Sequence, residues 1–135
     1  MFKKVHVFRV KPKQELLSSV AQYCRQHGIS SGVVIGIVGT VESARLEFLM
    51  ELPGKCESAD YSGPLEIICA QGSVASKDGS QVVHIHIQLA GQNVCQGGHL
   101  AEATVFSTAE VVIGELDYQL LRQFDSGTGR NELVD

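Results

Sequence analysis

Residues 81–100 read QVVHIHIQLAGQNVCQGGHL, and this stretch gives the clearest indication of the fold. A run rich in valine and isoleucine stops at Gly91, Gln92 and Asn93, and a second run follows almost at once. Apolar runs separated by glycine and asparagine are typical of strands joined by a turn. A connection this short leaves two neighbouring strands antiparallel. We therefore expect an antiparallel hairpin with strands near Gln81–Ala90 and Gly98–Phe106.

The same pattern extends over most of the chain from Gly32 onward. Turn-forming residues interrupt the apolar runs, as at Pro53–Gly54 and Lys77–Gly79. Short connections of this kind favour a sheet whose neighbouring strands are mostly antiparallel. The other expected strands are Lys4–Val10, Gly32–Val41, Ala44–Leu52, Leu65–Gly72 and Ala109–Leu116.

One long helix is expected near the N-terminus. Pro12 suits the first helical turn, and Gly28 stands where a left-handed cap would end the helix. The apolar stripe between them has helical spacing and consists of Leu16, Leu17, Val20, Ala21 and Cys24. The prediction is an α+β fold: a single domain over residues 1–135, with a mostly antiparallel sheet of about seven strands and one main helix. Residues 117–135, which lose periodicity, are expected to form a terminal arm.

Composition argues against several classes of protein. Of the 135 residues, 44% are hydrophobic and 19% are charged, which is far from the composition of disordered chains. The net charge of −4 does not support a surface that broadly holds a nucleic-acid backbone, since such surfaces need clustered lysine and arginine. The glycines at Gly32, Gly36 and Gly39 lack the Lys-Ser/Thr ending of a phosphate-binding loop.

Membrane and redox signals are weak. The longest apolar stretch, Gly32–Val41, has about half of the ~20 residues that a membrane-spanning helix needs, and no charged-then-apolar leader opens the chain. The four cysteines form no C-x-x-C pair, and without a secretion signal an even number of cysteines does not imply disulfides. We therefore expect a soluble, cytoplasmic protein with reduced thiols and no membrane partner.

Three of the five histidines, His84, His86 and His99, fall within sixteen residues. Side chains alternate along a strand, so His84 and His86 emerge on one face about 6.6 Å apart, close enough to share an ion. Neutral imidazoles suit zinc and several other divalent first-row metals, and an open fourth position is usual in reactive or exchangeable zinc sites. We predict a divalent metal, with zinc as the first choice, at these three residues. In the alternative, the imidazoles lie on a half-wet strand face and bond water or backbone.

The position of His99 depends on the register of the hairpin. A two-residue turn at Gln92–Asn93 sets a register that places His99 directly opposite His86. A different loop length, or a bulge at Gly97–Gly98, would change the face on which His99 emerges. Cys95 lies about 13 Å from His99 along an extended strand, so it is left out of the predicted site.

A metal-dependent enzyme would also need a carboxylate near the ion to act as a general base. Glu102 and Glu110 are the nearest candidates in the sequence. Glu102 differs from His99 in strand parity, so it should point away unless a bulge intervenes, and both are expected as surface or structural carboxylates. Arg45 and Glu66 are candidates for a buried or interface ion pair. No catalytic residue is assigned.

Several segments, taken in order, resemble the PPC domain, which plants and prokaryotes share. They are GTVESARL at Gly39–Leu46, YSGPLEII at Tyr61–Ile68, HIH at His84–His86, GGHL at Gly97–Leu100 and AEVVI at Ala109–Ile113. The likeness spans nearly the whole chain, including an ending similar to that of prokaryotic members. The chain lacks the Arg-Gly-Arg core of the AT-hook, the minor-groove element that accompanies the domain in plants.

The resemblance implies an α+β fold, a homotrimer and a metal at the positions of His84, His86 and His99. Plant relatives are nuclear DNA-associated regulators, so the family analogy implies DNA as a partner, which the net charge does not support. We expect a homotrimeric, metal-binding module with a binding or regulatory role, whose histidine site accepts a small anionic ligand or stabilises the assembly. The alternative is a small zinc-dependent, hydrolase-like enzyme that uses the same histidines.

Overall fold

The computed structural model describes residues 1–134, which form one helix and seven strands. In chain order the elements are β1 (Phe2–Val10), α1 (Leu16–Gln26), β2 (Gly32–Glu51), β3 (Lys55–Lys77), β4 (Ser80–Ala90), β5 (Cys95–Leu116), β6 (Arg122–Asp125) and β7 (Arg130–Leu133). The predicted α+β class, with one helix and mostly antiparallel sheet, is confirmed.

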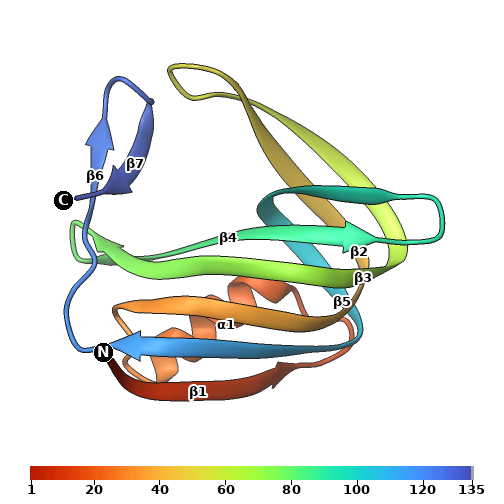
Figure 1. Cartoon of the computed structure of the whole chain (residues 1–135), viewed down its shortest axis with the longest axis horizontal. Coiled ribbons are helices and arrows are strands. Elements are labelled where there is room, and N and C mark those ends of the chain that lie inside the picture. Colours follow the sequence, from red (N-terminus) through yellow and green to blue (C-terminus); the bar gives the residue numbers. More distant parts are fainter. Residues whose placement is uncertain (135) are drawn as a thin grey trace.

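The strands form two sheets rather than one. The larger has five strands in the order β1-β5-β2-β3-β4, and all of its named pairings are antiparallel. Strand β4 also pairs with the first part of β5, so the pairings among β2, β3, β4 and β5 form a closed circuit. Strands β6 and β7 form a separate small hairpin near the C-terminus (Figure 1). The seven strands expected in one sheet correspond to the five strands of the larger sheet, because two pairs of them are each one continuous strand, β2 and β5. Strands β6 and β7 lie in the segment that was expected only as a terminal arm.

Three of the strands are longer than the sequence pattern predicted. The breaks expected at residues 42–43 and 107–108 are absent, because β2 and β5 each run straight through. Shifts of register between Val41 and Ser43, and between the pairs Gly39–Ala109 and Val41–Val105, absorb the irregular positions. Such bulges bend a strand without ending it. Residues 55–64, which were not expected as strand, extend β3 because they pair with the second half of β2.

Helix α1 begins at Leu16. Pro12 was expected in the first helical turn, but it lies four residues before the helix. The N-cap is Glu15, whose carboxylate accepts hydrogen bonds from first-turn amides and, at 2.9 Å, from the Ala103 amide of β5. At the other end Gly28 has φ +66°, which confirms the predicted left-handed position. No helix in the described part of the chain has the length and apolar character to cross a membrane.

The core lies between α1 and one face of the larger sheet (Figure 1). Leu16, Val20 and Cys24 form the buried side of the helix. On β4, Ile85 and Ile87 are buried among them, and residues that alternate with them emerge on the opposite face. This alternation sets the orientation of the histidines described next.

Candidate metal centre

Strands β4 and β5 bring three imidazoles together on the outer face of the sheet. Residues His86 and His99 are direct cross-strand partners, as the sequence predicted. The ring centroids lie 5.0 Å apart for His84 and His86, 4.9 Å for His84 and His99, and 5.5 Å for His86 and His99. One ring nitrogen from each residue lies within 4.8 Å of the other two. The three side chains therefore lie close enough together to share one metal ion.

Partial burial keeps two of these imidazoles neutral. His84 and His99 are half-buried, whereas His86 is exposed. Burial, followed by the charges of His99, His86, Arg122 and Arg130, lowers the pKa of His84 to about 4. Burial also lowers the pKa of His99, although Glu47 opposes that shift. A neutral imidazole is the form that binds metal ions, so the lowered pKa values of His84 and His99 favour these two residues as ligands near pH 7.

The donor set fits a divalent transition metal. The Nδ1 atom of His99 is buried and has no hydrogen-bond partner. Such an orphaned buried atom costs free energy unless something bonds to it. Three imidazole nitrogens form a common donor set for zinc, with one position left for water or another ligand. The residues present therefore fit the ion that the sequence pattern predicted.

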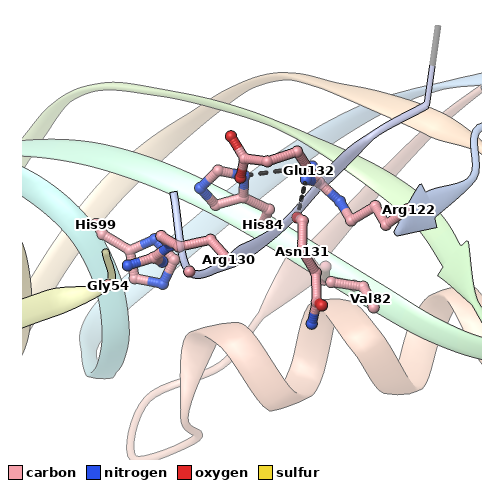
Figure 2. Close-up of a pocket in the computed structure, with 10 residues that line it drawn as sticks. Gly54, Val82, His84, His99, Arg122, Arg130, Asn131 and Glu132 are labelled. Carbon is pink, nitrogen blue, oxygen red and sulfur yellow. Dashed lines mark hydrogen bonds between the residues drawn. The ribbon is translucent and has the colours of Figure 1, made fainter. Parts of the chain in front are cut away.

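The C-terminal hairpin adds two arginines to the site. The Arg122 guanidinium donates to the Ser73 hydroxyl at 3.0 Å. It also donates to the backbone carbonyl of Asn131 at 2.9 Å and lies 3.4 Å from Nδ1 of His84 (Figure 2). The Nε atom of Arg122 is buried without a partner. A second guanidinium, that of Arg130, donates to the Cys56 thiol at 3.0 Å. Both side chains come from the segment that the sequence predicted only as a terminal arm.

Two adjoining cavities surround the imidazoles. The larger, of about 330 Å³, is lined by Gly54, Val82, Val83, His84, His99, Arg122, Gly129, Arg130, Asn131 and Glu132 (Figure 2). The smaller, of about 210 Å³, is lined by Glu47, Leu49, His84, His86, His99, Arg130 and Glu132. Sequence reasoning missed both arginines, Glu47 and Glu132. Of these, only Glu47 could have been found from a strand register, because it pairs with His99 between β2 and β5.

The two carboxylates considered for catalysis do not join the site. A bulge in β5 does precede Glu102, but Glu102 lies 3.7 Å from the guanidinium of Arg45. Glu110 is exposed on the part of β5 that pairs with Arg9 of β1. The structure therefore leaves both as surface or structural carboxylates, as expected.

Two further expectations concern Arg45 and Cys95. The ion pair considered between Arg45 and Glu66 is wrong, because Arg45 pairs with Asp60, its cross-strand neighbour, at 2.8 Å. Glu66 instead accepts a hydrogen bond from the Thr40 hydroxyl at 3.2 Å. Cys95 is an exposed free thiol at the start of β5, outside the histidine cluster, as expected.

Comparison with known proteins places the chain among relatives of similar fold. It is 34% identical over 133 residues to the bifunctional protein GlmU from Synechococcus sp. (strain JA-3-3Ab), covering 96% of this chain and 20% of the relative. The chain thus spans about a fifth of that curated relative's length. A metal-containing protein from Archaeoglobus fulgidus superposes with a TM-score of 0.90 at 25% identity, over 100% of this chain and 96% of the other.

Two further structures share the fold. A plant- and prokaryote-conserved (PPC) protein from Pyrococcus horikoshii has a TM-score of 0.86 at 25% identity, over 100% of this chain and 95% of that protein. A candidate DNA-binding protein from Bacteroides thetaiotaomicron has a TM-score of 0.91 at 20% identity, over 99% and 96% of the two chains. The family model of the Plants and Prokaryotes Conserved (PCC) domain matches residues 1–117. The chain therefore belongs to this family, the one that its sequence motifs resemble.

Proposed function

We propose that this chain is a homotrimeric, metal-binding protein of a single domain, with a binding or regulatory role. One divalent ion per chain, zinc as the first choice, would bind at His84, His86 and His99. The observation that carries the proposal is the convergence of three imidazole nitrogens within 4.8 Å. The Archaeoglobus fulgidus protein of the same fold, described as metal-containing, supports it.

The protein's own contribution is to hold three neutral donors in place. The β4–β5 pairing fixes His86 against His99, and the buried alternate residues of β4 keep His84 on the same outer face. Because three protein ligands leave a position open, the bound ion would act as a Lewis acid that holds a small anionic ligand. An ion bound by His84 and His86 of β4 and by His99 of β5 would also cross-link these two strands.

An exposed apolar face supports self-association. Val5, Val7 and Val38 are 50%, 68% and 68% exposed. Val7 alternates with Phe8, which stacks on Tyr23 of α1 at 3.7 Å, so Val5 and Val7 lie on the face turned away from the helix. Val38 lies on the same face because it alternates with Ile37, which is buried in the core. Strands β1 and β2 flank β5, which places the valines in one region of the sheet. Apolar patches of this kind mark interaction sites, and we assign this one to a homotrimer interface.

The other roles rank lower. A hydrolase-like enzyme is the second choice, because Glu102 and Glu110, the carboxylates that the sequence offered as a general base, line neither cavity around the imidazoles. DNA association remains an analogy with family members, and the net charge of −4 opposes it. We place the protein in the cytoplasm, which is consistent with its four free cysteines.

The test is zinc binding by the untagged protein at equilibrium, compared between wild type and His86→Ala. We expect the variant to bind zinc at least about tenfold more weakly, since one of three donors is lost. His27→Ala is the matched control, because His27 is exposed on the helix side and lies outside the cluster. Equal zinc binding by wild type and His86→Ala would refute the three-histidine site.

A further inference from the structure

The C-terminal hairpin places two guanidiniums beside the histidine cluster, and neither of them has a role in the proposed metal site. We propose that this cavity binds a small dianion, such as phosphate or a dicarboxylate, recognised jointly by the metal ion and by Arg122 and Arg130. The inference rests on the proposed metal site and specifies the class of ligand that this site takes.

The charges of the two arginines are not compensated by direct ion pairs. Within residues 1–134, the hydrogen bonds of Arg122 go to the neutral groups of Ser73, Asn131 and His84, and that of Arg130 goes to the Cys56 thiol. Both guanidiniums are half-buried and line the larger cavity. Half-buried guanidiniums with free N–H donors are suited to carboxylate and phosphate groups, which they bind through charge-assisted hydrogen bonds.

Metal uptake and the Arg122 contact exclude each other at His84. A guanidinium only donates, so Nδ1 of His84 must supply a lone pair to the Arg122 contact at 3.4 Å. A neutral imidazole has one such lone pair, whichever nitrogen carries it. If a metal ion takes that lone pair, Arg122 loses this acceptor and one of its N–H groups becomes available. The ion and a free guanidinium donor would then lie on the same side of the cavity.

The charge of the cavity points to a dianion. Two arginines, Arg122 and Arg130, and two carboxylates, Glu47 and Glu132, line the two adjoining cavities. When the histidines are neutral, the two positive and two negative charges cancel. A bound divalent ion then gives the cavities a net charge of about +2. A bound dianion would restore neutrality, so anion affinity should depend on the metal. The volume of about 330 Å³ is at the low end for ligand cavities, which favours a small ligand.

The hairpin is held in the position that this role requires. Its turn lies against the tip of the β2–β3 hairpin, where an added Cβ on Gly129 would come within 2.9 Å of the Gly54 nitrogen. At the opposite end the Ser76 amide of β3 donates to the Leu120 carbonyl at 2.9 Å, just before β6. These contacts fix both arginines against the outer face of the sheet.

Calorimetric titration of the zinc-loaded and metal-free 135-residue chain with inorganic phosphate and with succinate tests the proposal. The two anions distinguish a phosphate from a dicarboxylate ligand, and neutral succinamide is the control for shape. The informative variants are Arg122→Gln and Arg130→Gln. The matched control is Arg25→Gln, because Arg25 is an exposed arginine of α1 outside the cavity. Zinc content is measured for every sample.

We expect at least one of the dianions to saturate zinc-loaded wild type and Arg25→Gln, and succinamide not to bind. Loss of either cavity arginine should weaken anion binding about tenfold to hundredfold, the effect of losing charge-assisted hydrogen bonds. Arg122→Gln should keep its zinc, because the arginine competes with the ion. Equal anion affinity with and without zinc, equal affinity in all variants, or no saturation by either anion overturns the inference. Failure to bind zinc at all would instead refute the proposed function on which it rests.

Discussion

At the scale of single residues, the proposed metal site includes an imidazole that resists protonation. His84 lies beside two other histidines and near two arginines, and burial is the largest cause of its lowered pKa of about 4. The unfolded chain would bind a proton at this residue near the ordinary histidine value of about 6.5. The folded and unfolded states therefore differ in proton affinity, and this difference makes stability depend on pH.

The sign of that dependence follows from the direction of the shift. A histidine with a depressed pKa in the folded state contributes stability above about pH 6.5, and this contribution is lost as pH falls toward about 4. We expect metal-free wild type to lose stability in this window, by roughly 1–3 kcal/mol from this group. His84→Gln should lose less over the same range, which denaturant unfolding at pH 7 and pH 4.5 would measure. An equal loss of unfolding free energy between pH 7 and pH 4.5 in wild type and in His84→Gln would contradict this account.

At the scale of elements, the two hairpins that meet above the site depend on a backbone contact. Gly129 has φ +70°, and a Cβ there would lie 2.9 Å from the Gly54 nitrogen and from the Pro53 carbonyl carbon. Contact this short between a side chain and backbone requires one hairpin to move. The arginines of the C-terminal hairpin would move with it.

We expect Gly129→Ala to loosen residues 122–133, with faster amide hydrogen exchange there and a loss of stability of about 1–3 kcal/mol. Gly28→Ala is the matched control, because Gly28 has φ +66° but an added Cβ meets nothing within 4 Å. Gly28→Ala should lose only roughly 1 kcal/mol of unfolding free energy, from the strain of alanine at positive φ, and should leave amide hydrogen exchange in the hairpin unchanged. Equal exchange in the two variants would show that the contact does not hold the hairpin.

The elements also show which parts of the site could be predicted from sequence. The register of His86 against His99 follows from local information, namely strand alternation and a two-residue turn. Arg122 and Arg130 reach the site only because a short, aperiodic hairpin docks on β3 and on the β2–β3 tip. These contacts join residues far apart in the chain, so no local sequence pattern predicts them. The apparent strand breaks were misread for a related reason, since bulges within long paired strands resemble turns in a single sequence.

At the scale of the whole molecule, the proposed homotrimer makes the outer face of the sheet an interface. Val38 is 68% exposed and lies beside Glu110 in the β2–β5 pairing. A second carboxylate at this position would place like charges together and would be buried in a trimer at a cost of several kcal/mol.

We expect wild type to have three times the chain mass of 14.6 kDa in light scattering, and Val38→Asp to shift toward the monomer while remaining folded. Gln22→Glu adds the same charge on the exposed side of α1 and should leave the mass unchanged. A trimer of unaltered stability in Val38→Asp would exclude this face as the interface. A wild-type monomer would refute the trimer itself.

The measurement that most directly tests the central claim is the metal content of untagged protein, determined by elemental analysis together with its mass in solution. Wild type is compared with a variant in which His84, His86 and His99 are all replaced by alanine. We predict about one divalent ion per chain in wild type, held by the three histidines, and none in the variant. Equal metal content in both proteins, or none in wild type after exposure to zinc, would contradict a metal centre on this face of the sheet.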